Sequence, residues 1–314
     1  MNIQNPIEQF KSTIVKIRSD RSSGSQGVLN NTVDSLKLLL SQNTGVSAKK
    51  LLEIIRRGVN SLRSVHNQFS ALIHFSASFE TFLHPFVENI NTLKDAELLR
   101  KNILGFIKEY SEKWKDVNKK IAELAIKNID FAGKTIFLHS HSHTVETLFD
   151  YLKAKKIKVN IIQTEARPKM EGRLQAQYIS KLGYKVTFIV DSAVSKYAAK
   201  ADMAIVGCDC LFPDYFINKI GTQTLAHSCQ HLEIPFYILT DSRKFAFDRN
   251  IEPEKRKSST EIWSVEPETG IIPENFYYEG VPNKFITKVI TEQNVYDSEE
   301  LKEAFKENEY KSFT

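Results

Sequence analysis

Cysteine is scarce in this sequence, and long apolar stretches are missing. The 314 residues include three cysteines, Cys208, Cys210 and Cys229, without the paired spacing of a zinc site. Because no secretory signal precedes them, we expect no disulfide framework. No apolar run approaches the ~20 residues that cross a bilayer. We therefore predict a cytoplasmic protein that has no membrane partner.

A large excess of charge of one sign is also missing. Lys and Arg number 43 against 38 Asp and Glu, and the resulting formal net charge of +5 is spread along the chain. Nucleic-acid-binding domains usually concentrate basic residues in a patch, so direct nucleic-acid binding is not expected. With 41% hydrophobic and 26% charged residues, the composition is that of a globular protein. Its length favours two domains.

The first domain, expected over residues 1–130, is predicted to be helical. Its apolar residues recur at helical spacing, as in Val33, Leu36 and Leu40. One interruption, at residues 20–27, combines two glycines with small polar residues. This segment is either a flexible connector or a loop whose amides and hydroxyls meet an anion at the start of the next helix.

The second domain, expected over residues 131–314, alternates short strands with helices. The predicted strands are β-branched or aromatic runs at 135–138, 159–163, 186–190, 203–206 and 235–239. Such alternation predicts an α/β fold, a Rossmann-like domain with a mostly parallel sheet. Ligands of such sheets bind beyond the carboxyl ends of the strands. Polar and ionisable residues follow nearly every predicted strand, so a site is expected at that edge.

Four ordered segments carry a resemblance to one superfamily. They are TEARPKMEG at 164–172, DSA at 191–193, ADMAIVGCD at 201–209 and NKIGT at 218–222. The chain resembles the methylthioribose-1-phosphate and ribose-1,5-bisphosphate isomerases and the alpha, beta and delta subunits of the exchange factor for initiation factor two. The match extends over about residues 117–295 and is weaker over the helical domain.

The resemblance implies which residues carry the chemistry. A sugar phosphorylated at its anomeric carbon cannot open to a free aldehyde, so its isomerase needs an acid for the ring oxygen and a base for hydrogen transfer. Asp209 matches the acid of the isomerases, although an Asp after a strand also caps turns. Ser140 stands where the isomerases have a catalytic Cys, so the expected thiol is missing.

Histidines offer a replacement base. His139, His141 and His143 alternate around Ser140, and an imidazole with a pKa of ~6.5 suits proton transfer. We take His141 as the catalytic candidate. The alternatives are helix capping or backbone hydrogen bonds, and a metal site that would require the segment to stay extended. We expect neither a metal nor a cofactor.

The remaining candidates concern ligand binding. By resemblance, Asn218 and Lys219 lie at the sugar, and Arg167 either grips phosphate or ties its own loop together. Glu171 stands where the isomerases have Gln, which suggests a ligand other than methylthioribose phosphate. The further candidates are His139 in the α/β domain and Ser25 and Arg21 in the helical domain.

Three functions stay open at this point. One is an aldose-ketose isomerase acting on a phosphorylated pentose. Another is a non-catalytic subunit like that of initiation factor 2B, which senses sugar phosphates and joins related subunits. The third is a stand-alone sensor or storage protein. In each case the expected ligand is a phosphorylated sugar, and by resemblance a homodimer forms through the carboxy-terminal domain.

Overall fold

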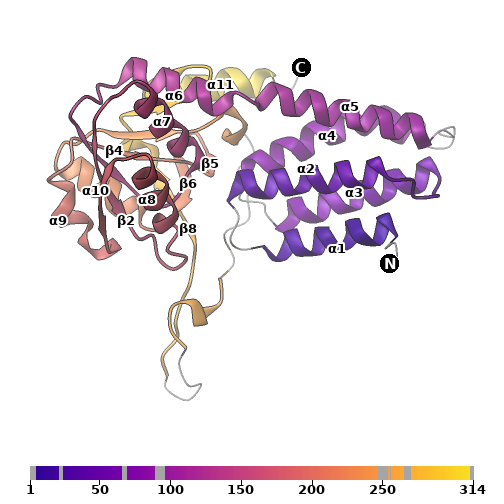
Figure 1. Cartoon of the computed structure of the whole chain (residues 1–314), viewed down its shortest axis with the longest axis horizontal. Helices are drawn as coiled ribbons and strands as arrows, with labels where there is room; N and C mark the ends of the chain where they lie inside the picture. The colour runs from indigo at the N-terminus through magenta and orange to yellow at the C-terminus, as the bar shows by residue number, and fades with distance from the viewer. Residues whose placement is uncertain are drawn as a thin grey trace. The chain divides into compact units, whose positions relative to one another are not determined.

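A computed structural model describes residues 5–20, 24–65, 69–88, 96–246, 254, 256–264 and 270–311. The chain divides into two compact units, Met1–Asp116 and Val117–Thr314 (Figure 1). The boundary predicted from the sequence, near residue 130, lies one helix later in the chain. Within the described ranges, no helix has both the length and the apolarity needed to cross a bilayer.

The first unit is helical, as the apolar spacing predicts. Its helices are α1 (Pro6–Ser19), α2 (Ser25–Ser41), α3 (Ala48–Val65), α4 (Ser70–Glu88) and α5 (Ala96–Trp114). Their apolar faces are fully buried at Leu36, Leu51 and Phe75. Aromatic rings join α4 to α5, with the Phe82 and Phe106 centroids 4.7 Å apart. The burial of these faces is the main source of stability for such a bundle.

A buried arginine closes the carboxyl end of α2. Arg100 of α5 donates from its guanidinium to the carbonyls of Leu39 and Gln42 and, at 2.5 Å, to the Thr44 hydroxyl. The last carbonyls of a helix have no partner within the helix. Arg100 supplies that partner from another helix, which ties α5 to α2.

The second unit is an α/β domain. It begins with α6 (Val117–Asn128), β1 (Thr135–Leu138), α7 (His143–Ala154), β2 (Asn160–Thr164), α8 (Gly172–Lys181) and β3 (Lys185–Ile189). It continues with the short helices η1 (Asp191–Ala193) and α9 (Val194–Ala198), then β4 (Met203–Val206), β5 (Cys210–Leu211), β6 (Tyr215–Lys219), α10 (Thr222–His231) and β7 (Phe236–Leu239). The last elements are η2 (Ser242–Lys244), η3 (Ser259–Glu261), β8 (Tyr278–Pro282), η4 (Asn283–Phe285), β9 (Lys288–Ile290), β10 (Val295–Tyr296) and α11 (Ser298–Lys311).

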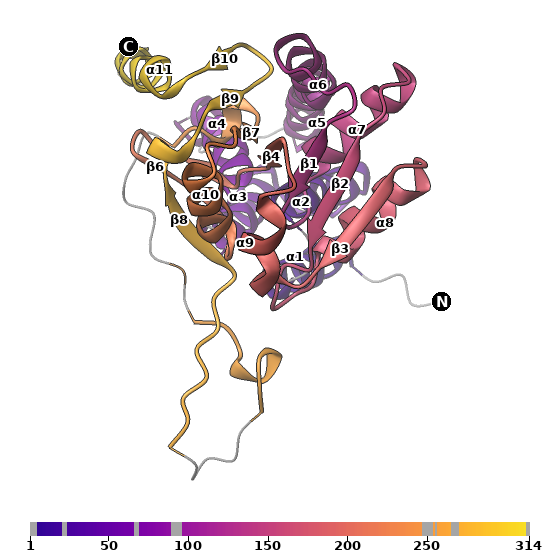
Figure 2. The same cartoon turned by 90° about the vertical axis from the view of Figure 1, so that its left-hand side faces the viewer.

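These strands form two sheets. The larger has the order β10-β9-β7-β4-β1-β2-β3, and in it β10 alone pairs antiparallel with its neighbour (Figure 2). The smaller sheet, β5-β6-β8, is antiparallel. The central strands are apolar because both of their faces are covered, and every residue of β4 is buried. The predicted α/β fold with a mostly parallel sheet is confirmed.

The strand order locates the ligand-binding edge. From β1 the chain proceeds to β2 and β3 on one side, and it then returns to place β4 on the other side of β1. Ligands of open parallel sheets bind beyond the carboxyl ends of the strands where the order reverses in this way. The crevice expected here lies between the ends of β1 and β4, where Ser140 and Asp209 follow.

We predict that Arg100→Met lowers the free energy of unfolding by about 1–3 kcal/mol, because it leaves carbonyl groups without a donor. Urea denaturation would measure the change, with Lys101→Met, at an exposed site on the same helix, as the matched control. An equal effect of the two substitutions would contradict the capping role.

Candidate functional site

Glu171 lies at the centre of the candidate site. The Ser140 hydroxyl, just after β1, donates to Glu171 Oε1 at 2.6 Å. The Lys219 ammonium, at the end of β6, lies 3.1 Å from Glu171 Oε2. Each oxygen of one carboxylate is therefore held by a residue from a different element. The two residues that depart from the isomerase pattern, Ser140 and Glu171, are hydrogen-bond partners.

Lys219 is a buried cation. Its exposed fraction is 4%, and its ammonium lies over the Tyr278 ring at 4.5 Å and the Tyr277 ring at 5.2 Å. Pairing of β6 with β8 sets Tyr278 opposite Lys219. A buried charge costs several kcal/mol unless it is paired, and here the Glu171 carboxylate and two ring faces offset that cost.

Asp209 is a carboxyl group whose environment favours the neutral form. Its backbone N–H donates to the Ile217 carbonyl at 2.9 Å, and within the described residues its carboxylate has no hydrogen-bond partner. Burial raises the pKa of Asp209, and although the Lys244 and Lys219 charges oppose this, the net direction is upward. Such a carboxyl group holds its proton to a higher pH than a solvated Asp does, which suits a proton donor.

Lys244 is a site residue that the sequence analysis did not select. Its ammonium donates to the Cys208 carbonyl, next to Asp209. It belongs to η2, after β7, and no motif of the sequence marks it. Its position after the carboxyl end of the parallel strand β7 is the feature of the sequence that could have identified it.

His139 has a structural role. Its Nε2–H donates to the Ile220 carbonyl at 2.9 Å, and its Nδ1 accepts from the Thr164 hydroxyl at 2.6 Å. Burial lowers the pKa of His139, which keeps the ring neutral in this tautomer. A Cβ on Gly221 would lie 2.8 Å from the ring, so a glycine is needed there. His139 thus holds the short loop that joins β6, which ends at Lys219, to α10.

His141 and His143 are held by another carboxylate. His141 Nε2 lies 2.9 Å from Glu146 Oε1, and His143 Nδ1 lies 3.2 Å from Glu146 Oε2. Among the described residues, neither ring forms a hydrogen bond with the Ser140 hydroxyl, which donates to Glu171 instead. His141 is the candidate base that the sequence suggests beside Ser140. In the structure Glu171 is a second candidate, because its carboxylate accepts directly from the Ser140 hydroxyl.

The loop of Arg167 is tied by Asp191. The two Asp191 oxygens accept from the backbone N–H groups of Ala166 at 2.9 Å and Arg167 at 2.7 Å. The Arg167–Pro168 bond is cis. In the described part of the chain, the Arg167 guanidinium has no hydrogen bond or ion pair. Of the two roles considered for Arg167, loop tying is performed by Asp191, and the guanidinium stays available to an anion.

Unusual backbone conformations cluster around Glu171. Ser140, Ala166 and Met170 have positive φ values of 69°, 58° and 55°. Each such residue costs about 1–3 kcal/mol and is usually retained at functional sites. Close packing continues at Gly172, where a Cβ would lie 1.9 Å from the Thr164 carbonyl oxygen. The conformation of this region is therefore set by the surrounding structure rather than by local preference.

Asn218 and Glu279 organise the start of α10. The Asn218 amide donates to the Thr222 hydroxyl at 3.0 Å. Glu279 Oε1 accepts from the backbone N–H groups of Gly221 and Gln223, each at 2.8 Å. A carboxylate thus occupies the positive end of this helix. The structure places Asn218, predicted to bind sugar, beside Lys219 at the end of β6.

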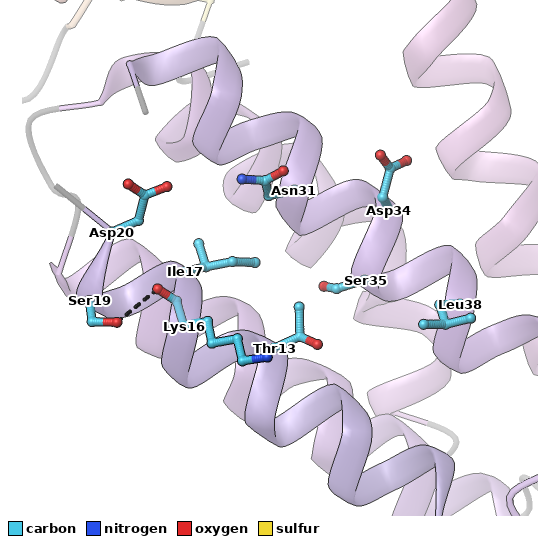
Figure 3. Close-up of a pocket in the computed structure, with 9 residues that line it drawn as sticks. All are labelled: Thr13, Lys16, Ile17, Ser19, Asp20, Asn31, Asp34, Ser35 and Leu38. Carbon is cyan, nitrogen blue, oxygen red and sulfur yellow. Dashed lines mark hydrogen bonds between the residues drawn. The ribbon is translucent and has the colours of Figure 1, made fainter. Parts of the chain in front are cut away.

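The helical unit contains the two remaining candidates. Arg21 lies outside the described residues. Ser25 begins α2 with 4% exposure, and its hydroxyl has no hydrogen-bond partner in the described chain. A groove of about 510 Å³ between α1 and α2 is lined by the carboxylates of Asp20 and Asp34 as well as by Lys16 (Figure 3). The carboxylates make this groove a poor phosphate site.

Comparisons with known proteins relate the chain to one family. Residues 21–298 match the Initiation factor 2 subunit family. A Pyrococcus furiosus protein named translation initiation factor eIF-2B subunit 2-like is 31% identical over 205 residues, which cover 64% of this chain and 70% of that protein. The ribose 1,5-bisphosphate isomerase of Archaeoglobus fulgidus is 27% identical over 208 residues, which cover 63% of this chain but less than two thirds, 65%, of the isomerase.

A solved structure shares the fold. The 5-methylthioribose 1-phosphate isomerase of Pyrococcus horikoshii OT3 superposes with a TM-score of 0.77 over 95% of this chain and 88% of that chain, at 17% identity. The agreement extends over both units of the chain. It supports the fold described above.

The histidine pair should make stability depend on pH. Burial acts to raise the pKa of Glu146, but hydrogen bonds from His141 and His143 lower it from 4.5 to about 2. The hydrogen bond with Glu146 raises the pKa of His143 above 6.5. The Glu146 contribution is full above pH 4.5 and is lost as pH falls towards 2, whereas the His143 contribution is full below pH 6.5 and is lost as pH rises.

We predict that Glu146→Gln destabilises the protein most between pH 4.5 and 6.5. Urea denaturation across a pH series would measure the difference from the unsubstituted protein, with the exposed Glu123→Gln as the matched control. A difference that stays constant from pH 5 to well above pH 8 would contradict the ionic role of the pair.

Proposed function

The chain belongs to the Initiation factor 2 subunit family, and from that premise we propose that it is an aldose-ketose isomerase acting on a phosphorylated pentose. Its relatives include ribose 1,5-bisphosphate isomerases, which makes ribose 1,5-bisphosphate the first substrate to test. The cytoplasm remains the predicted location.

The observation that carries this proposal is the contrast between two carboxyl groups at one edge of the sheet. Glu171 is paired with the Lys219 ammonium and accepts from Ser140, as an ionised carboxylate does. Asp209, with its raised pKa, favours the protonated form. Environments that separate two carboxyl groups in this way assign one as base and the other as acid.

The proposed reaction uses both groups. Asp209 donates its proton to the ring oxygen, and the bond between that oxygen and the first carbon breaks. Glu171 removes the proton from the second carbon and returns it to the first carbon. The second hydroxyl loses its proton to Asp209 as the carbonyl forms, so that no net proton is consumed. Lys219 stabilises the negative charge that develops on the oxygen of the second carbon.

In this proposal the two departures from the isomerase pattern compensate for each other. A serine hydroxyl is a poor base at neutral pH, and here it donates its proton rather than accepting one. Glu171, in the position where the isomerases have an amide, supplies the base. Ser140 then has a positioning role, because its hydroxyl orients the carboxylate.

A second candidate, a non-catalytic sugar-phosphate sensor that joins related subunits, is favoured by the same ion pair. Glu171 neutralises Lys219, and this removes part of the positive charge that would stabilise an enediolate. A sensor needs only ligand affinity, and it can therefore tolerate this loss. The two candidates differ in whether bound sugar phosphate turns over.

We predict that the purified protein converts ribose 1,5-bisphosphate to the ketose, and that Asp209→Asn and Glu171→Gln each lower kcat by about 10²-fold or more. Ser140→Ala should have a smaller effect. Because Asp209 acts as an acid, kcat should fall as pH rises through its raised pKa. Product formation would be measured by NMR, and ligand affinity by calorimetry.

Glu123→Gln is the matched control, because this exposed carboxylate lies on α6. Binding of ribose 1,5-bisphosphate with no turnover in the unsubstituted protein would reject the isomerase and favour the sensor. Absence of both binding and turnover would reject both candidates for this substrate.

We also propose a homodimer formed through the carboxy-terminal unit. Three apolar residues of this unit, Tyr277, Phe285 and Ile286, are buried within the single chain, at 5–7% exposure. They are therefore unavailable for a contact between chains, and the interface would use other residues. Light scattering after size exclusion should give twice the 36.0 kDa chain mass, and a mass of 36.0 kDa at micromolar concentration would contradict the dimer.

A further inference from the structure

A lysine-lined cavity lies at the end of the sheet opposite the candidate site. Its volume is about 410 Å³, and it is formed by the turns that join α7 to β2 and α8 to β3. Asn160 and Lys185, the first residues of these parallel strands, pair with each other. Because the candidate site follows the carboxyl ends of the strands, this cavity, at the amino ends of β2 and β3, is a separate feature. Figure 2 shows the two strands side by side at one side of the sheet.

Four lysines line the cavity, and no acidic residue does. They are Lys153, Lys156, Lys158 and Lys185. Throughout the described residues, no carboxylate forms an ion pair with any of the four. Lys155 and Lys181 flank them in the sequence and are also exposed. The lining of this cavity is therefore locally positive, whereas basic and acidic residues are interleaved over much of the chain.

The negative ends of two helices neutralise only part of the positive charge of these lysines. The carboxyl ends of α7 and α8 both precede the cavity, and each contributes about −0.5 of an elementary charge. Together they offset roughly one of the four lysines. The remaining positive charge, in a concave site with little competing negative charge, raises the local concentration of anions.

The backbone shapes the cavity for these side chains. Gly183 has a φ of +92°, and a Cβ there would lie 3.3 Å from the Lys153 ammonium. Lys156 has a φ of +58°, a conformation that a non-glycine residue rarely adopts. The Tyr184 hydroxyl donates to the Ile157 carbonyl at 3.0 Å and holds the two turns together. The two turns are thus linked, and their lysines line one cavity.

We propose that this cavity binds an oligophosphate, a small ligand that carries two or more linked phosphate groups. Lysine ammoniums bind phosphate as point charges from several directions, and four of them match a ligand with several negative charges. The volume lies within the ~300–1,000 Å³ typical of small-molecule sites. A cavity of this size favours a small ligand over the extended backbone of a nucleic acid.

Calorimetry with inorganic tripolyphosphate at about 0.1 M salt, where surface charges are screened beyond ~10 Å, tests the proposal. The cavity variant is Lys153→Gln/Lys156→Gln/Lys158→Gln. The matched control is Lys119→Gln/Lys120→Gln/Lys127→Gln, which removes the same charge from exposed positions on α6. Thermal unfolding confirms that both variants fold, as expected for exposed side chains.

The expected result is saturable binding of one tripolyphosphate per chain, weakened about tenfold or more in the cavity variant and little changed in the control. Equal weakening in both variants would show a general charge effect and overturn the proposal. Absence of binding would also overturn it. Single-stranded oligouridylate is the second probe. If it binds through the same lysines and tripolyphosphate does not bind, the proposal is overturned and the cavity is part of a nucleic-acid site.

Discussion

A buried ammonium requires a partner, and the pairing of Lys219 with Glu171 is the constraint on which the site depends. Lys219 is 4% exposed, and without an opposite charge it would cost several kcal/mol to bury. Glu171 supplies that charge at 3.1 Å. Its second oxygen then needs a donor, which Ser140 provides at 2.6 Å. Three elements far apart in the sequence are joined in this way.

The parallel sheet and its strained loops make this arrangement possible. Parallel pairing of β1 with β2 and β4 brings the ends of these strands to one edge. The turn into α8 then has to bring Glu171 back over that edge, and the positive φ values of Ala166 and Met170 accommodate the reversal. Asp191 holds the loop through two backbone N–H groups. Rigid elements thus place the carboxylate, as a preorganised site requires.

The contact between Ser140 and Glu171 changes how differences within the family are understood. Considered separately, a missing thiol suggests lost activity, and an added acid suggests a different ligand. As partners, the two residues form one unit in which the carboxylate replaces the thiol as the candidate base. At the opposite end of the sheet, the turns that connect α7 to β2 and α8 to β3 bring four lysines to one cavity.

Sequence periodicity by itself determined the fold class and placed five strands within one residue of their observed ends, because buried parallel strands are short apolar runs. The strand pattern also predicted that Ser140 and Asp209 would follow strand ends, and the resemblance to the isomerases placed Glu171 and Lys219 at the same site. The sequence did not predict Lys244 or the antiparallel strand β8, which brings Tyr278 over Lys219. Neither Lys244 nor β8 lies in a motif or in an alternating apolar run that would have identified it from the sequence.

The roles of the histidines were decided only in three dimensions. His139 and His141 are two residues apart and indistinguishable by type, yet one bonds to Ile220 and the other to Glu146. The sequence alone determines which groups can titrate and which strand end they follow. The tertiary structure decides which of them are neutralised, buried or available, because hydrogen bonding and desolvation depend on neighbours that are distant in the chain.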